Sequence, residues 1–265
     1  MKEFEIEEIY IYPVKSLSGI RLDKAVANEE GFEYDRKWML VDKSGSFISQ
    51  RTHPKLAQFQ CELTDKHLII RYEHSDIKMP LKPATSKYQD VSVWDSTLEG
   101  QEVNPEIAEW FSDLLCDSVS LVFHGQKSIR LKRFDKPPYQ TRVSFADGYP
   151  YLLLGTASME LLNSKLEEPI HLNRFRPNLV IRTELPHEED MWESIYANEV
   201  HFNNIKPCAR CIMTTVDQET GEMGKEPLKT LATYRQKSNN IYFGTNLIAL
   251  NTGIIRRGDF LKLSE

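Results

Sequence analysis

Short apolar or alternating segments, each bounded by Gly, Pro, Asn or Asp, recur along the whole chain. Alternation with a period of two is typical of strands that bury one face, and short continuous apolar runs are typical of fully buried strands. Strands at this spacing, without a helix between each pair, indicate barrels or sandwiches rather than a doubly wound sheet. The predicted strands are Ile6–Val14, Lys37–Asp42, His67–Tyr72, Ser118–Phe123, Tyr151–Leu154, Asn178–Arg182, Glu199–Ile205, Cys211–Val216, Ile241–Leu250 and Phe260–Leu263.

Helical signals are fewer. Asn104 and Pro105 suit an N-cap and a first-turn proline, and the apolar stripe that follows has helical spacing: Ile107, Trp110, Phe111, Leu114 and Leu115. A second helix is expected to begin near Thr156 and to bury Met159, Leu162 and Leu166. A third, shorter helix is expected from Pro227, carrying Leu228, Leu231 and Tyr234. The basic, proline-containing stretch 126–142 is the expected seam between two domains.

Composition narrows the class of protein. The 265 residues are 40% hydrophobic and 27% charged, which is ordinary for a globular chain. The net charge of −6 disfavours a nucleic-acid binder, whose footprint is usually basic. No stretch approaches the roughly 20 apolar residues of a membrane helix, so no membrane partner is expected. The acidic, alternating N-terminus is unlike a signal peptide, and we therefore expect a cytoplasmic protein.

The segment KPCARCIMTTVD, residues 206–217, holds two of the four cysteines. A zinc site would need further ligands, and no His-x3-5-His pair occurs in the chain. Arg210, between Cys208 and Cys211, favours a thiolate, and a soft thiolate suits a thiophilic metal. The alternative is a pair of small buried residues. Cys208 follows Pro207, whereas Cys211 opens a predicted strand, a rigid platform for a ligand; this favours Cys211.

Four other segments could bind an anion. Lys15 and Ser16 lie in a turn after a strand, where a lysine, a hydroxyl and free N–H groups can cradle a phosphate, although this motif alone favours a solvated hairpin turn. Arg36 precedes a strand, and the simplest interpretation is a surface charge. Arg174 and Arg176 are predicted on one face of a strand, where they could bind an anion; the alternative is a solvated edge. Gly155 to Ser158 lie at a helix start and could also bind an anion; the alternative is an ordinary N-cap. Arg51 and His53 are interpreted as surface residues.

In this order, these segments resemble the MOSC superfamily with its N-terminal β-barrel-like domain, and within it the amidoxime-reducing type. The motifs are YPVKSLSG, YDRKWMLVD, YLLLGTASMELLN, NRFRPNLVI, PCARCIMTTVDQETGE, EPLKTLATYR and GDFLKL. The resemblance implies an α+β, mainly β chain with a few peripheral helices: an N-terminal β-barrel-like domain over residues 1–124 and a MOSC β-barrel domain over residues 125–265.

The resemblance also implies a ligand and a site. The ligand is the molybdenum cofactor, a pterin that carries the metal. Cys211 would be the protein thiolate on molybdenum and the catalytic residue. Lys15, Ser16 and Arg36 would hold the phosphate end, and Ser158, Arg176, Asn178 and Arg210 would complete the cradle. The implied reaction is two-electron reduction of small N-hydroxylated compounds.

The electron source is expected to be a separate protein, ferredoxin-like or a flavin or haem reductase. The chain has no G-x-G-x-x-G nucleotide motif, and only three cysteines remain beside Cys211, whereas an iron–sulfur cluster usually takes four. The alternative function is a non-catalytic protein that carries the cofactor, or sulfur on Cys211.

Overall fold

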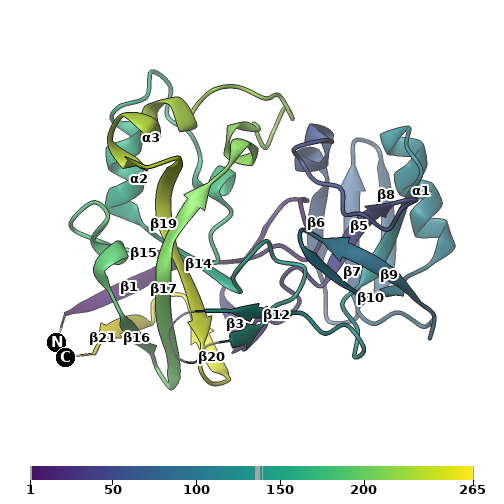
Figure 1. Cartoon of the computed structure of the whole chain (residues 1–265), viewed down its shortest axis with the longest axis horizontal. Coiled ribbons are helices and arrows are strands. Elements are labelled where there is room, and N and C mark those ends of the chain that lie inside the picture. Colours follow the sequence, from purple (N-terminus) through teal and green to yellow (C-terminus); the bar gives the residue numbers. More distant parts are fainter. Residues whose placement is uncertain (1, 135–137, 139, 265) are drawn as a thin grey trace.

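The computed structural model describes residues 2–134, 138 and 140–264. Figure 1 shows two lobes, both rich in strands, with the N- and C-termini close together on one of them. No helix among the described residues is long and apolar enough to cross a membrane. The predicted fold class, α+β and mainly β with peripheral helices, is confirmed.

The lobe that carries the termini, here called the barrel lobe, is built on a closed sheet. Within the described residues, seven strands pair in a ring in the order β14-β15-β1-β21-β16-β17-β19, and β19 pairs with β14 to close it. Their bounds are β1 Glu3–Ile11, β14 Tyr151–Gly155, β15 Leu179–Ile181, β16 Ser194–Ala197, β17 Val200–Arg210, β19 Asn240–Ala249 and β21 Phe260–Leu263.

The residue pattern of β1 shows how the sequence fits the barrel. Phe4 and Ile6 are buried, and the buried positions then shift to Ile9 and Ile11. The shift coincides with a bulge against β15 between Ile6 and Glu8, where one extra residue reverses the facing of the side chains. These four residues pack in the apolar core of the barrel.

Shorter elements surround the barrel. Two helices cover it at the top of Figure 1, α2 (Thr156–Asn163) and α3 (Leu228–Arg235). Leu166 lies beyond the end of α2 but still packs against the core beneath it. The remaining strands are β2 Ile20–Leu22, β3 Lys24–Asn28, β4 Gly31–Phe32, β12 Leu131–Arg133, β13 Gln140–Arg142, β18 Gln236–Lys237 and β20 Gly253–Arg256.

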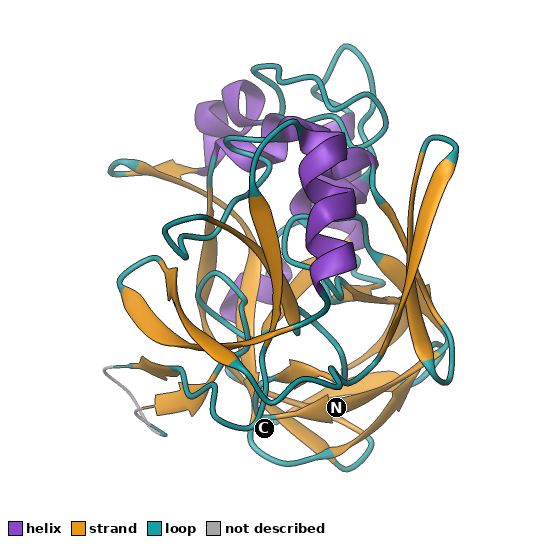
Figure 2. Cartoon of the chain, turned by 90° about the vertical axis from the view of Figure 1, so that its right-hand side faces the viewer, coloured by secondary structure: helices purple, strands orange, loops and turns teal. Residues whose placement is uncertain are grey.

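The second lobe is built from two sheets and one helix, and Figure 2 views the molecule from its side. One sheet has the order β5-β11-β10-β9 and the other β6-β7-β8. The bounds are β5 Trp38–Asp42, β6 Gln60–Leu63, β7 His67–Tyr72, β8 Ser75–Pro80, β9 Tyr88–Val93, β10 Ser96–Glu102, β11 Val119–Phe123 and α1 Pro105–Leu115.

Strand β5 has apolar cores on both of its faces, which explains its continuous apolar sequence. Trp38 and Leu40 pack on the side of α1, whereas Met39 and Val41 pack on the other side. The helix α1 has the predicted cap, since the Asn104 side chain accepts a hydrogen bond from the backbone N–H of Glu106.

The division at residue 124 stays a prediction. The structure adds that β1, at the start of the chain, is hydrogen bonded to β15 and β21 of the barrel. After β1 the chain rejoins the closed ring of strands only at β14, although β2 pairs with β1, and β3 and β4 pack against the barrel core. The stretch 126–142, the predicted seam, contains β12 and β13, which pair with each other; residues 135–137 and 139 lie outside the described residues.

Candidate functional site

A cleft of about 450 Å³ lies between the lobes. The second lobe contributes Arg51, Trp94 and Asp95 to its wall. The barrel lobe contributes the start of β14, the residues just before β15 and the end of β17. Seven of the eight residues that were predicted to bind the cofactor line it, namely Lys15, Ser16, Arg36, Arg176, Asn178, Arg210 and Cys211. Residues more than 160 positions apart in the sequence thus meet in one cavity.

The charge of this cleft is opposite to that of the chain. Its described lining includes the cationic residues Lys15, Arg36, Arg51, Lys132, Arg176, Lys206 and Arg210, against the carboxylates of Asp95 and Asp147. The whole chain has a net charge of −6. Such a concentration of cations in a concave site favours an anionic ligand.

The inner end of the cleft holds two arginines, Arg36 and Arg176, here called the inner arginine pair. Both guanidinium groups lie against the ring of Tyr12, at 4.4 and 4.2 Å from its centroid. Arg176 donates to the carbonyl of Leu17 at 2.7 Å, and Arg36 donates to the Oδ1 of Asn178 at 3.0 Å. Burial, together with the nearby charge of Arg36, lowers the pKa of Arg176 to about 10.

The backbone around this end has an uncommon conformation. Ser16, Arg36 and Arg176 have φ angles of 72, 49 and 56°, in the left-handed region that non-glycine residues seldom adopt. Residues held in this region are frequently found at ligand sites. The carbonyl of Ser16 accepts a hydrogen bond from Nε2 of Gln50 at 2.7 Å, and this bond holds the turn.

Asn178 and Arg210 join the strands around the pair. The Asn178 amide donates to the carbonyl of Tyr10, and its Oδ1 accepts from the N–H of Leu152 at 3.2 Å. Arg210 donates from Nη2 to the carbonyl of Phe175 at 2.6 Å and from Nη1 to the Sγ of Cys208 at 3.1 Å. The cation between the two cysteines therefore contacts Cys208.

Lys15 is buried and already has partners. Its Nζ donates to the carbonyl of Phe145 at 2.9 Å and pairs with the carboxylate of Asp147. Burial lowers the pKa of Lys15, and the ion pair with Asp147 opposes this shift. Burial by itself raises the pKa of Asp147, but Lys15 and then Arg51 outweigh it and hold that pKa below its usual range.

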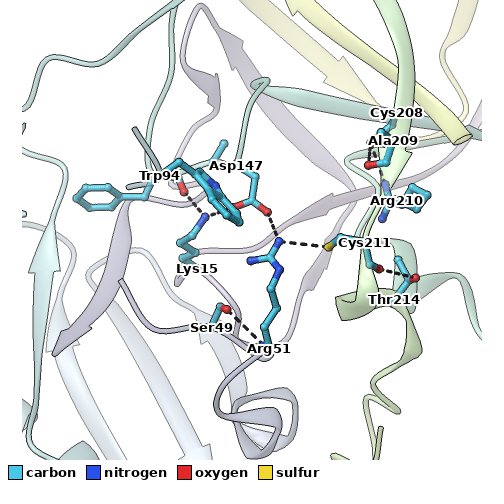
Figure 3. A network of polar contacts seen from close by, with 12 residues as sticks. Lys15, Ser49, Arg51, Trp94, Asp147, Cys208, Ala209, Arg210, Cys211 and Thr214 are labelled. Carbon is cyan, nitrogen blue, oxygen red and sulfur yellow. Dashed lines mark hydrogen bonds and ion pairs between the residues drawn. The ribbon is translucent and has the colours of Figure 1, made fainter. Parts of the chain in front are cut away.

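Cys211 lies at the outer end of the cleft and is exposed. Figure 3 shows its side chain facing Arg51. Its Sγ accepts a hydrogen bond from Nη2 of Arg51 at 3.2 Å, and the same Nη2 lies 3.5 Å from the Oδ2 of Asp147. The Arg51 guanidinium is 4.7 Å from the centroid of the Trp94 ring, whose Nε1 donates to Asp147 at 3.1 Å. One arginine thus connects the thiol to a carboxylate and an indole.

The prediction of a strand over residues 211–216 was wrong. Strand β17 runs up to Arg210 and ends there, and a 3-10 helix follows at Ile212–Thr215. Two irregularities in its pairing with β19, one of them at Pro207, re-aim the end of β17. Cys211 is therefore placed by the end of a barrel strand and by the turn after it. Among the described residues, the segment that follows pairs only through an isolated β-bridge of Val216 with Met223.

The prediction that Arg174 and Arg176 share one face of a strand was also wrong. Leu172–Phe175 is a 3-10 helix, and Arg176 follows it with a positive φ. Arg174 consequently points elsewhere and pairs with Asp217 at 2.6 Å. The period of two fails here because β15 begins only at Leu179.

Ser158 does not belong to the lining of the cleft. It is fully buried in α2, where its hydroxyl donates to the Oε1 of Glu189 at 2.7 Å and accepts from the N–H of His187 at 2.8 Å. The N–H of Gly155 also donates to Glu189. The start of α2 therefore has a protein carboxylate where the sequence suggested a ligand anion.

Sequence reasoning missed three residues at the outer end. Arg51 was interpreted as a surface charge, but it is a central cation of the cleft. Asp147 and Trp94 gave no motif of their own. Trp94 does carry one signal: it sits in the two-residue turn between β9 and β10, a position that Asn or Gly usually fills, and its φ is 57°.

The donor set limits how a metal could be held. Among the residues that the structure describes, no group of three or more His, Cys, Asp or Glu side chains is placed to bind a metal ion. Cys211 offers a single exposed thiol beside a strongly cationic cavity. These residues fit a metal that brings most of its ligands with it on an anionic organic group.

Comparison with known families agrees with this arrangement. The model of the MOSC N-terminal beta barrel domain matches residues 3–118, and the model of the MOSC domain matches residues 140–262. The chain belongs to the MOSC family. The resemblance stated from the motifs is confirmed. In this MOSC protein, the cleft lies between the regions that the two models match, although β1, within the first match, is part of the barrel.

Several curated relatives span most of the chain. The human mitochondrial amidoxime-reducing component 1 is 30% identical over 96% of this chain and 81% of its own length. The bovine mitochondrial amidoxime reducing component 2 is 32% identical over 98% of this chain and 81% of its own length. A molybdenum cofactor sulfurase of rice is 29% identical over 98% of this chain but only 34% of its own length.

Proposed function

We propose that this MOSC protein binds the molybdenum cofactor and reduces small N-hydroxylated compounds. The observation that carries the proposal is the exposed thiol of Cys211 at one end of a cleft whose other end is lined by buried cations. A phosphate-bearing metal cofactor requires these two features at once. The names of the human and bovine relatives support the same chemistry.

Different residues along the cleft would bind different parts of the cofactor. The inner arginine pair, with Ser16 and Asn178, would hold the phosphate end of the cofactor, and Cys211 would be its protein thiolate. Lys15 would take part once its pair with Asp147 opens or is shared. Bound there, the cofactor supplies two-electron transfer to the N–O bond of the substrate, and the protein supplies orientation and electrostatics.

The overall reaction fixes what must reach the site. An amidoxime takes up two electrons and two protons, its N–O bond breaks, and an amidine and water leave. The electrons would come from a separate donor protein, because the sequence has neither a nucleotide-binding motif nor the cysteines of a second redox centre. A chemical reductant should replace that donor, whereas NADH or NADPH alone should give no turnover.

The test is oxidation of a reduced viologen dye by the molybdenum-loaded protein. Addition of benzamidoxime should accelerate bleaching of the dye and yield benzamidine, which is measured by chromatography. The matched control is benzamidine in place of benzamidoxime, which offers no N–O bond. An equal rate of bleaching with both compounds would contradict the proposal, as would turnover with a nicotinamide cofactor alone.

A second candidate function is that of a carrier, which holds the cofactor or a sulfur atom on Cys211 and passes it on. The exposure of that thiol and the similarity to the rice molybdenum cofactor sulfurase favour it. A carrier would release molybdenum to a cofactor-free acceptor enzyme and would not consume benzamidoxime. The dye assay and the release assay therefore separate the two functions.

A further inference from the structure

Arg51 presents unused hydrogen-bond donors at the thiol end of the cleft. Its Nη2 contacts the Sγ of Cys211 and the carboxylate of Asp147. Among the described residues, no protein group accepts a hydrogen bond from its Nε or Nη1. A guanidinium has five N–H donors in a planar fork, so most of its capacity remains available beside the thiol.

The position of this guanidinium is fixed by several contacts. The Trp94 ring supports one side, and Asp147 binds Nη2 (Figure 3). The neighbouring residue Gln50 is fully buried and exchanges two amide hydrogen bonds with Gln218, in the loop beyond Cys211, at 3.1 and 3.0 Å. Arg51 is therefore held at a set distance from the loop that carries the thiol.

Charge distinguishes the substrate of the proposed reaction from its product. An amidoxime is neutral near neutral pH, whereas the amidine that it yields takes up a proton and becomes a cation. The hydroxyl oxygen that is removed can accept a hydrogen bond, and the product lacks this oxygen. A fixed cation at the reacting end therefore favours the substrate and repels the product.

Resting on the function proposed above, we infer that Arg51 binds the N–OH oxygen of the substrate and drives release of the cationic product. The guanidinium donates to the oxygen that leaves as water. After the two electrons and two protons have been taken up, the amidinium faces the same positive charge without an oxygen to bind it. Arg51 thereby discriminates between the two ligands, because it attracts the substrate and repels the product.

The test measures binding to the molybdenum-loaded, oxidised protein without a reductant, so that no turnover occurs. Dissociation constants for benzamidoxime and benzamidine are obtained by calorimetry for the wild type and for Arg51→Gln. Loss of a charge-assisted hydrogen bond should weaken benzamidoxime binding by about tenfold or more. Loss of the repulsion, with Asp147 released, should strengthen benzamidine binding by about fivefold.

Opposite changes for the two ligands are the signature of this role, since a merely structural role would shift both in one direction. Equal weakening of both ligands, or no change in either, would overturn the inference. Arg51→Lys retains the charge but not the fork, so benzamidoxime should weaken and benzamidine should stay unchanged. Arg21→Gln removes one charge from an exposed arginine outside the cleft lining and should change neither constant.

If Arg51→Gln retained too little molybdenum for calorimetry, Arg51→Lys would decide the question. An equal response of both ligands to that variant would overturn the inference. The two proposals fail in different ways. If the proposed function is wrong, the wild-type protein does not turn over benzamidoxime. If only the role of Arg51 is wrong, the wild type turns over and the variants bind both ligands alike.

Discussion

The two ends of the cleft hold their cations in different ways. At the inner end, the arginine pair is largely buried and donates to the carbonyls of Leu17 and Arg176. Arg36 also donates to Asn178 and to the buried carboxylate of Asp35, so buried backbone and side-chain groups together set the geometry of the pair. At the outer end, the contacts of the Arg51 guanidinium with described residues are all with side chains: the thiol of Cys211, the carboxylate of Asp147 and the ring of Trp94.

This difference indicates which end of the cleft suits a permanently bound ligand and which end suits a molecule that binds and leaves. Groups fixed by buried contacts are preorganised, and they bind a permanent ligand without further ordering. Arg51 is also held in place, but it is partly exposed and keeps free N–H donors beside the thiol, where a substrate can bind and a product can leave. The inner end therefore suits a resident cofactor, and the outer end suits the reacting molecule.

Removal of the thiol should have the largest effect and should act on the outer end alone. Cys211→Ser replaces a soft ligand with a hard, protonated hydroxyl, so reductase activity should be lost and the ligand spectrum of the metal should change. The measurements are dye-coupled turnover and X-ray absorption at molybdenum.

Cys208→Ser is the matched control for this change. Cys208 contacts Arg210 and not Arg51, so this variant should keep both the activity and the molybdenum–thiolate signature. Loss of activity in Cys208→Ser with full metal content, while Cys211→Ser stays active, would reverse the assignment.

Breaking the inner end should lower the occupancy of the cofactor. Under the proposed function, Arg36→Ala would remove a charge-assisted contact with the phosphate. Such a contact contributes about 1.5–3 kcal/mol, so affinity should fall roughly ten- to a hundredfold. Molybdenum per protein after purification measures this loss. Arg51→Gln, at the outer end, should retain far more metal. Equal metal content in the two variants would erase the distinction between the ends.

Ser158→Ala tests a residue that lies outside the cleft, in contrast to the variants at its two ends. The change leaves the N–H of His187 without its acceptor and removes one donor from the buried Glu189. We expect a cost of about 1–3 kcal/mol in the free energy of unfolding, measured with denaturant, and no change in molybdenum content. A marked loss of metal with stability intact would return Ser158 to the cofactor site.

The smallest effect concerns the pair of Lys15 and Asp147, which lies between the ends. Because the folded pKa of Asp147 is depressed, its ionised form stabilises the fold above the unfolded pKa of about 4, and this contribution is lost as the pH falls below it. The difference in melting temperature between the wild type and the less stable Asp147→Asn variant should be largest near neutral pH. The gap should shrink in acid; a gap that widened there would contradict the assignment.

The prediction of the fold from sequence worked where one signal dominated. The strands at His67–Tyr72 and Phe260–Leu263 and the Asn104 cap came out as predicted, because alternation and capping are local. Cys211 and Arg176 were assigned to strands incorrectly, because apolar runs suggested pairing that no neighbouring strand provides. The bulges in β17 depend on its partner β19, which lies 30 or more residues further along the chain.

The sequence by itself determined the types of residue in the site: one cysteine beside an arginine, and basic residues dispersed along the chain. Tertiary structure decided which of them meet. It brought Arg51 from the second lobe to the thiol and placed Ser158 against Glu189, away from the cleft. The physical reason is that ion pairs and ring contacts depend on distances in space, which no local pattern in the sequence encodes.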